Sequence, residues 1–409
     1  MLKRLRHHLR QLGPGLITGA ADDDPSGIAT YSQAGAQFGT RMLWSLVITL
    51  PLMAAIQLVS ARIGYVTGHG LAANMKRAIP RPWLLLLVGL LVTANTLNIA
   101  ADIAAMAEAL RLLVGGSAHV YAITFGLVCV VMQVFLPYQS YVRWLKWLTL
   151  ALLAYLGVVC MVHIDWGEVL LHALLPQLRW DADLLLTLVA VLGTTISPYL
   201  FFWQAGQEVE DRQAGAGQPH SAHEVRRHLR RIKFDTIVGM SFSNAIAFFI
   251  MLSTAATLHR AGITHIETSA QAVEALRPLA GHQAALLFAL GIIGTGLLAV
   301  PVLAGWEGSL SLKLERGQGR GFYGVIAVAT LVGVALCFSP MDPVRELFWS
   351  AVFNGVAAVP IMAAMMLLAS SRKVMGGHTI GPRLRAMGWL ATGVMLATVL
   401  ALGWMSVAG

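Results

Sequence analysis

Charged residues are scarce in this sequence, and their scarcity excludes most soluble proteins. Asp, Glu, Lys and Arg make up 12% of the 409 residues, whereas hydrophobic residues make up 57%. A soluble domain carries roughly a quarter of charged residues. The composition therefore predicts an all-α, multi-pass membrane protein. Because most Lys and Arg residues fall in loops on one side of the predicted helices, the net charge of +9 indicates topology and not a nucleic-acid partner.

Cysteine and suitably spaced histidine are also lacking. The three cysteines all lie inside apolar runs, so neither a disulfide framework nor a cysteine metal site is expected (Cys129, Cys160 and Cys337). None of the 13 histidines lies mid-run with an acid at ligand spacing, which argues against a histidine-ligated metal. No cleavable signal peptide is expected, because the basic segment Met1–Arg10 is followed by no small-residue cleavage site.

The apolar runs are long enough to cross about 30 Å of hydrocarbon. Lys and Arg gather in the N-terminal tail and after the even-numbered runs, which predicts a cytoplasmic N-terminus and an external C-terminus in the inner (plasma) membrane. We expect one transmembrane domain over 1–409, a monomer whose partners are the lipid bilayer and its substrate. The eleven predicted spans are 13–38, 42–65, 83–111, 119–137, 145–163, 184–204, 234–258, 282–310, 321–339, 344–369 and 386–407.

Two of these spans are interrupted by residues that break a helix. The first contains Asp22–Gly27 (DDDPSG), and the sixth contains Gly193–Tyr199 (GTTISPY). Proline removes a helical hydrogen bond, and the freed backbone groups are tolerated in a membrane only where they line a polar cavity. Interrupted spans five apart predict an inverted five-plus-five repeat with a binding site between the breaks. The expected halves are 12–163 and 184–369, and 386–407 is an extra helix.

The acids of the first break are the leading candidates for chemistry. Asp24 directly precedes the proline and is expected to face the cavity. Asp22 and Asp23 point elsewhere, because successive helical residues are about 100° apart. Three carboxylates this close are not all ionised in a low dielectric, so at least one is expected to hold a proton. All three are therefore predicted to take part in proton coupling, although capping or pairing alone is the alternative for Asp22 and Asp23.

The third span supplies a further acid, Asp102. It shares one helix face with Asn95 and Asn98 through steps of three and four residues. An ionisable residue within a span indicates function by default. Asp102 is predicted to relay a proton released near Asp24 towards the cytoplasm.

The first break resembles a motif of the NRAMP family. Asp24–Gly27 (DPSG), Ala29–Thr30 (AT) and Gln33–Gly39 (QAGAQFG) lie on that family's DPGN-x-AT-x-x-QAGAQFG, and Ala101–Ala104 resembles its D-L-A-E stretch, whose Asp belongs to the proton route. The resemblance covers most of the chain, from Gly13 to the tenth span. It implies a leucine-transporter-like fold with eleven or twelve spans, and proton-coupled transport of divalent metals.

The departures from the family pattern fall on its metal-binding residues. The aspartate is kept as Asp24, but the asparagine falls on Gly27, the methionine on Ser197 and the first histidine on Tyr199. A thioether selects soft transition metals, whereas hydroxyls and carboxylates suit hard ions or organic groups. The family's second histidine and its third-span glutamate are also replaced (Gln204 and Ala105).

Two substrates fit such a remodelled site. The first prediction is citrate, free or with a bound divalent cation, because the DPSG and TTISPY segments look more like the NRAMP-related citrate carriers. Hydroxyls and half-helix N-termini also suit carboxylates. The alternative is a hard divalent cation, Mg²⁺ or Mn²⁺, with Asp24 as metal ligand, as in other divergent NRAMP relatives. No cofactor is expected beyond H⁺ as coupling ion. The predicted substrate-binding residues are Asp24, Ser26, Gly27, Thr194, Thr195, Ser197 and Tyr199.

A transporter is favoured over the other classes that the acids suggest. An intramembrane aspartyl protease needs two acids on facing helices, and Asp24 with Asp102 superficially qualifies. The paired breaks and the family motif have no place in such an enzyme, so no enzymatic activity is expected. Broken helices around a closed site also suit alternating access better than a continuous channel.

Overall fold

The computed structural model describes residues 19, 22–135, 148–177, 181–214, 222–310, 328, 330–338 and 341–408. Within these ranges the regular structure is entirely helical, without a β-strand. Seven of the described helices are long and apolar enough to cross a membrane, and shorter apolar helices lie at Ala118–Met132 and Leu150–Met161. Each predicted span contains described helix, so the prediction of an all-helical membrane protein is confirmed.

The predicted spans correspond, in chain order, to α3 (Pro25–Phe38), α4 (Leu43–Thr67), α6 (Arg81–Val114), α7 (Ala118–Phe135), η2 (Leu148–Leu152) with α9 (Leu153–Met161), α11 (Ala182–Thr195) with α12 (Pro198–Ala214), α13 (Ala222–Thr254), α16 (Ala284–Leu310), helical residues 330–336, α18 (Pro343–Ser370) and α20 (Pro382–Ala408). The connecting elements are η1 (Gly39–Met42), α5 (Leu71–Ala78), α10 (Trp166–Leu174), the π-helical turn η3 (Ala255–His259), α14 (Ser269–Glu274), α15 (Arg277–Ala280), η4 (Gly281–Gln283) and α19 (Arg372–Met375).

Both predicted helix breaks are present. Asp24 has extended backbone (φ −71°, ψ 170°), and α3 begins at the next residue, Pro25. Proline is favoured at a first helical position because its missing N–H has no helical partner there. In the sixth span, α11 ends at Thr195 and α12 begins at Pro198, so two residues form the break.

Glycines let the broken helices approach their neighbours at backbone distance. A Cβ atom added at Gly35 of α3 would lie 2.2 Å from the carbonyl oxygen of Met251 in α13. One added at Gly193 of α11 would lie 2.1 Å from the carbonyl oxygen of Ala351 in α18. Any larger side chain would separate these helices, so the glycines fix where α3 and α11 cross the rest of the bundle.

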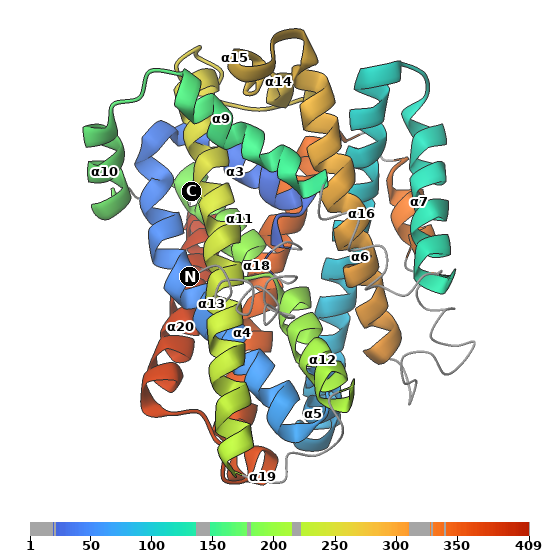
Figure 1. Cartoon of the computed structure of the whole chain (residues 1–409), viewed down its shortest axis with the longest axis vertical. Helices are drawn as coiled ribbons and strands as arrows, with labels where there is room; N and C mark the ends of the chain where they lie inside the picture. The colour runs from blue at the N-terminus through green and yellow to red at the C-terminus, as the bar shows by residue number, and fades with distance from the viewer. Residues whose placement is uncertain are drawn as a thin grey trace, which may run out of the picture.

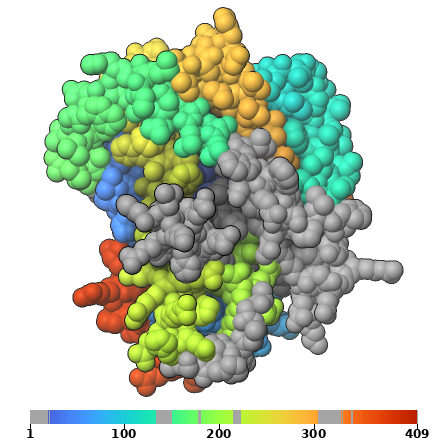
Figure 2. All heavy atoms as spheres, viewed as in Figure 1, coloured from blue at the N-terminus to red at the C-terminus, as the bar shows by residue number. Residues whose placement is uncertain are grey.

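The outer helices carry many exposed apolar side chains. In Figure 1, α14 and α15 cover one end of the bundle, and α5 and α19 lie at the other. Figure 2 shows α7 and α10 at opposite flanks of the upper half. Large apolar side chains stand exposed on these flanks and on α20, such as Leu127, Leu170 and Trp404. In a bilayer these side chains face lipid.

Candidate functional site

Asp24 is the N-cap of α3 and joins the two helix breaks. Its Oδ1 atom accepts hydrogen bonds from the Ser26 hydroxyl at 2.6 Å and from the backbone N–H of Gly27 at 2.8 Å. Its Oδ2 atom accepts a hydrogen bond from the Tyr199 hydroxyl of α12 at 3.0 Å. All four residues are buried. The carboxylate therefore both starts α3 and contacts the second half of the other broken span.

Two hydroxyl pairs connect α3 to the end of α11. The Ser26 and Thr194 hydroxyls lie 3.3 Å apart, and the Tyr31 hydroxyl lies 3.1 Å from Thr195 Oγ1. Thr195 gives its own hydrogen to the carbonyl oxygen of Val191 at 2.5 Å. Because a hydroxyl has one hydrogen, Tyr31 must be the donor towards Thr195. These contacts surround Asp24 with oxygen atoms.

Ser197 lies in the second break, and its hydrogen is used locally. Its hydroxyl donates to the carbonyl oxygens of Gly193 at 2.9 Å and Thr194 at 2.7 Å. These carbonyls end α11 and have no helical partner of their own. Ser197 therefore caps α11, and only its lone pairs are left for a substrate.

Asp22 and Asp23 contact α13 rather than α12. The Ser243 hydroxyl lies 2.6 Å from Asp22 Oδ2 and 3.0 Å from Asp23 Oδ1, and all three side chains are buried. Asp22 and Asp24 also repel Asp23 electrostatically. The first break is therefore divided, with Asp24 facing α12 and the two preceding acids facing α13.

The polar face predicted on α6 is divided among different partners. The Asn95 side chain donates to the carbonyl oxygen of Leu303 at 3.2 Å. Asn98 and Asn354 of α18 exchange two amide hydrogen bonds at 2.9 and 3.2 Å. Asp102 is fully buried, neither of its carboxyl oxygens has a hydrogen-bond partner among the described residues, and it interacts electrostatically with Asp24. Of these three side chains, Asp102 is thus the one without a hydrogen bond to the described part of the chain.

Two positions at which the family's ligands are replaced have local explanations. A Cβ added at Gly27 would lie 3.3 Å from the Tyr31 ring and 3.4 Å from the Thr194 hydroxyl, so a side chain there would press against Tyr31. Gln204 lies farther along α12 and donates to Glu208 at 3.1 Å. This hydrogen bond of Gln204 runs along α12 and away from the break.

The donor atoms gathered around Asp24 are oxygens. They belong to carboxylates, to aliphatic hydroxyls and to the phenol of Tyr199, which interacts electrostatically with Asp22, Asp24 and Asp102. Among the described residues, no group of three His, Cys, Asp or Glu side chains forms a closed metal site. A buried, acidic site lined by oxygen atoms offers the kind of ligands that hard cations accept.

Several contacts of the site join residues that the sequence did not single out. Ser243 and Asn354 lie 221 and 256 positions from their partners Asp22 and Asn98. A polar run in the middle of the seventh span, Ser241–Asn244, was the available signal for Ser243. Tyr31 lies at an unspecified position of the family motif, and nothing in the sequence indicated its contact with Thr195.

The comparisons with known proteins agree with this geometry. The family model described as "Natural resistance-associated macrophage protein-like" matches residues 15–405. The chain belongs to the NRAMP family. Curated relatives named divalent metal cation transporter MntH include one from Caldanaerobacter subterraneus, 26% identical over 96% of this chain and 92% of the relative. Another, from Acidiphilium cryptum, is 27% identical over 92% of this chain and 86% of the relative.

Solved structures support the same fold at low sequence identity. A manganese transporter from Eremococcus coleocola aligns with a TM-score of 0.76 at 16% identity, covering 98% of this chain and 95% of the other. The nucleobase-cation symporter Mhp1 aligns with a TM-score of 0.60 at 14% identity, covering 97% and 93%. The leucine-transporter-like fold is thus confirmed. This NRAMP protein is a multi-pass membrane transporter and not an intramembrane protease.

Proposed function

We propose that this NRAMP protein is a secondary transporter that moves a hard divalent cation, Mg²⁺ or Mn²⁺, across the inner membrane. The observation that carries the proposal is the buried Asp24 carboxylate, which faces the second helix break among hydroxyl groups. A carboxylate between two helix breaks at mid-membrane offers a cation a compact anionic ligand. The hydroxyl groups of Ser26, Thr194 and Tyr199 lie around the Asp24 carboxylate and offer neutral oxygen ligands.

The predicted substrate citrate receives no support, and the cation that was the alternative takes its place. Asp22, Asp23 and Asp24 repel an anion, and the hydrogen-bond partners found for them are hydroxyls and backbone N–H groups. A trianion in this site needs compensating positive charge. The relatives described above are named as divalent metal cation transporters, which adds independent support.

The chemistry of the donors favours hard cations over soft ones. Carboxylate, hydroxyl and carbonyl oxygens are the ligands that Mg²⁺ and Mn²⁺ accept, whereas thioethers favour softer metals. Ser197 stands where the family pattern has methionine. Gly27 contributes no side-chain ligand, so the cation keeps part of its water.

Asp102 is the group that we assign to proton coupling. A carboxylate without any partner is expensive to bury, so this side chain is expected to carry a proton while Asp24 is empty. A divalent cation at Asp24 would make proton loss from Asp102 easier, because the two acids interact electrostatically. The proton would then leave towards the side predicted to be cytoplasmic.

Uptake into proteoliposomes tests the proposal. Purified protein is reconstituted with an inward proton gradient, and accumulation of ⁵⁴Mn²⁺, of ²⁸Mg²⁺ and of ¹⁴C-citrate is compared with empty liposomes. We expect Mn²⁺ or Mg²⁺ to accumulate and to acidify the lumen, and citrate to stay outside. Citrate accumulation without either metal would overturn the proposal. Metal uptake that leaves the luminal pH unchanged would remove only the proton coupling.

A further inference from the structure

Gln57 lies in the middle of α4 and is 1% exposed, yet its side-chain amide is unpaired. Neither Nε2 nor Oε1 has a hydrogen-bond partner in the part of the chain that the structure describes. Other buried amides of the bundle are paired, such as Asn98 with Asn354 and Gln204 with Glu208. An unpaired amide is costly to bury, so the presence of glutamine at this position needs an explanation.

The register between α4 and α12 places Gln57 beside the second helix break. The Ser60 hydroxyl donates to the carbonyl oxygen of Phe201, and Gly64 lies against the carbonyl oxygen of Ala205, where a Cβ atom would have no room. The second pair lies four residues beyond the first on both helices, so α4 and α12 run in the same direction. Gln57 lies three residues before Ser60 on the same face of α4, and it is therefore level with the first residue of α12.

The side chain of Gln57 leans towards the break. Side chains on a helix point back towards its N-terminus. This direction brings Gln57 to the level of Ile196 and Ser197, the two residues that separate α11 from α12. Tyr199, in the first turn of α12, donates to Asp24. Gln57 and Asp24 thus approach the start of α12 from two sides, one from α4 and the other from α3.

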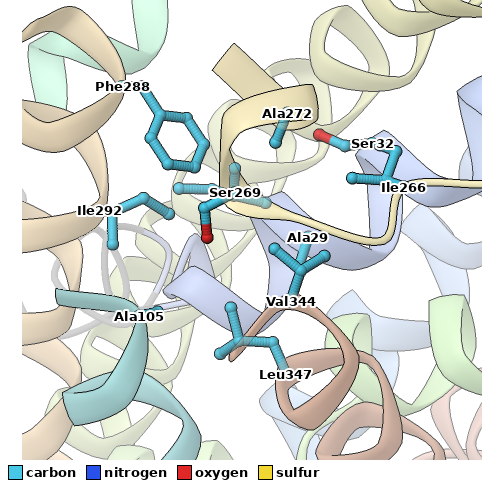
Figure 3. A pocket seen from close by; sticks show the side chains of 11 residues that line it. Ala29, Ser32, Ala105, Ile266, Ser269, Ala272, Phe288, Ile292, Val344 and Leu347 are labelled. Carbon is cyan, nitrogen blue, oxygen red and sulfur yellow. The ribbon is translucent and has the colours of Figure 1, made fainter. Parts of the chain in front are cut away.

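Water kept by a cation at Asp24 has little room on the side predicted to be external. One to two turns beyond Asp24 along α3, Figure 3 shows a hollow between Ala29 of α3, Ile266 and Ser269 of the segment around α14, and Leu347 of α18. Its volume is about 10 Å³, which is about the space that one water molecule needs. Towards α13, the two preceding acids share one hydroxyl group. The start of α12 is therefore the side on which we place the water of the cation.

A side-chain amide suits the water shell of a hard cation. A water that binds a cation through its oxygen turns its hydrogens outwards and needs an acceptor for them. Both lone pairs of Gln57 Oε1 are free, whereas Asp24 Oδ1 already accepts two hydrogen bonds. Gly27 supplies no side-chain ligand, so the proposed cation keeps water for which Gln57 is an acceptor.

We propose that Gln57 is a further residue of the cation site, and that its Oε1 atom accepts a hydrogen bond from a water that the cation keeps. The amide is unpaired while the site is empty and becomes paired when a cation binds. The empty protein is thus less stable than it would be with an apolar residue at this position. This inference rests on the proposed transport of divalent cations.

Gln57→Leu separates this role from a structural one, because it should raise stability and lower affinity together. Leucine has a similar size without polar atoms, so the thermal-unfolding midpoint of the empty protein should rise by a few degrees. The Mn²⁺ or Mg²⁺ concentration for half-maximal uptake should rise about tenfold, the effect of one lost hydrogen bond, with the maximal rate within about twofold of wild type. Gln57→Glu keeps an acceptor oxygen and should hold the half-maximal concentration within about threefold of wild type.

Ser60→Ala is the matched control, one turn away on the same face of α4. It removes the hydrogen bond to Phe201, so it should lower the unfolding midpoint and leave the half-maximal concentration unchanged. An unchanged half-maximal concentration in Gln57→Leu would overturn the role of Gln57. A lower unfolding midpoint of empty Gln57→Leu would also overturn it, because the amide would then have a partner in the empty protein.

A thermal-shift measurement with Mn²⁺ or Mg²⁺ separates this inference from the proposed transport. Either cation should raise the midpoint of the wild type, and should raise that of Gln57→Leu much less at the same concentration. This pattern without uptake would uphold the role of Gln57 and remove the transport proposal. Uptake by the wild type with equal stabilisation of both proteins would keep the transport proposal and overturn the role of Gln57. A wild type that neither binds nor takes up either cation would overturn both.

Discussion

Replacement of Asp24 by asparagine tests the central ligand without removing the helix cap. Asparagine is as good an N-cap as aspartate, and its Oδ1 atom can keep the hydrogen bonds from Ser26 and Gly27. Its Nδ2 atom would then meet the Tyr199 hydroxyl, which can accept instead of donate. We therefore expect the variant to fold, with a change in unfolding free energy of about 1 kcal/mol or less.

The effect on the cation should be far larger than the effect on the fold. A divalent cation about 4 Å from a carboxylate gains about 8 kcal/mol at an effective dielectric constant of 20. If half of this remains after dehydration of the ion, Asp24→Asn loses about 4 kcal/mol, or about a thousandfold in apparent affinity. Uptake by the variant should be indistinguishable from that of empty liposomes.

Initial rates of Mn²⁺ or Mg²⁺ uptake measure this difference, with a thermal-unfolding midpoint as the check on folding. Asp22→Asn is the matched control, because Asp22 contacts Ser243 and not the hydroxyls around Asp24. It should leave a measurable rate. A folded Asp24→Asn variant that transports within about threefold of wild type would refute the assignment of Asp24. Equal loss in both variants would mean that the acids act as one unit.

Three further predictions concern the surroundings of the site. Gly27→Asn should cost about 1–3 kcal/mol of stability and not improve Mn²⁺ uptake, because an added Cβ would lie 3.3 Å from the Tyr31 ring. A higher apparent affinity for Mn²⁺ in uptake, at undiminished stability, would contradict this prediction. Asn98→Leu and Asn354→Leu should each lower the free energy of unfolding by about 1–3 kcal/mol, because each leaves the other buried amide unpaired. The double variant should lose less than the sum of the two single variants. Denaturant unfolding of all three variants measures this difference. Burial raises the pKa of Asp342, the cap of α18, above its ordinary value of 3.8. The folded state therefore binds the proton of Asp342 more tightly than the unfolded state does. The stability that this bound proton contributes is lost as the pH rises from about 4 through the raised pKa. Asp342→Asn keeps the cap and should flatten the dependence of the unfolding midpoint on pH over this range; an unchanged slope would count against it.

The helix breaks were predictable because their causes are local. Pro25 and Pro198 interrupt apolar runs, and each begins a half-helix in the structure. Acids beside the first break also marked the site, since charge is so costly at that depth. The all-helical architecture followed from run length and composition in the same way.

Contacts between helices were not predictable from local pattern. Tyr31 meets Thr195, and Asp22 meets Ser243, because α3 crosses α11 and α13 at particular heights. Those heights depend on close backbone contacts such as the one at Gly35, which no periodicity in the sequence specifies. For the same reason the shared helix face of Asn95, Asn98 and Asp102 did not reveal that each has different surroundings.

The substrate was the point at which the first prediction from the sequence found no support and its alternative fitted better. The replaced ligands at Gly27 and Ser197 suggested an organic anion, and hydroxyl groups alone fit that reading. The structure places the Asp24 carboxylate beside those hydroxyls, with Asp22 and Asp23 behind it against α13, and turns the Ser197 hydrogen back onto α11. The proposed cation is therefore favoured over citrate by the charge of the site more than by its hydrogen-bonding groups, and this charge was already visible at Asp22–Asp24.

Asp24 is both the N-cap of α3 and the proposed ligand of the transported cation. Its Oδ1 lone pairs hold the Ser26 hydroxyl and the Gly27 N–H, which form the first turn of α3. A cation that binds Oδ1 competes for the same lone pairs, and the first turn then loses its terminal hydrogen bonds. If the proposed cation binds Oδ1, the first turn of α3 would be wound when the site is empty and frayed when the site is loaded.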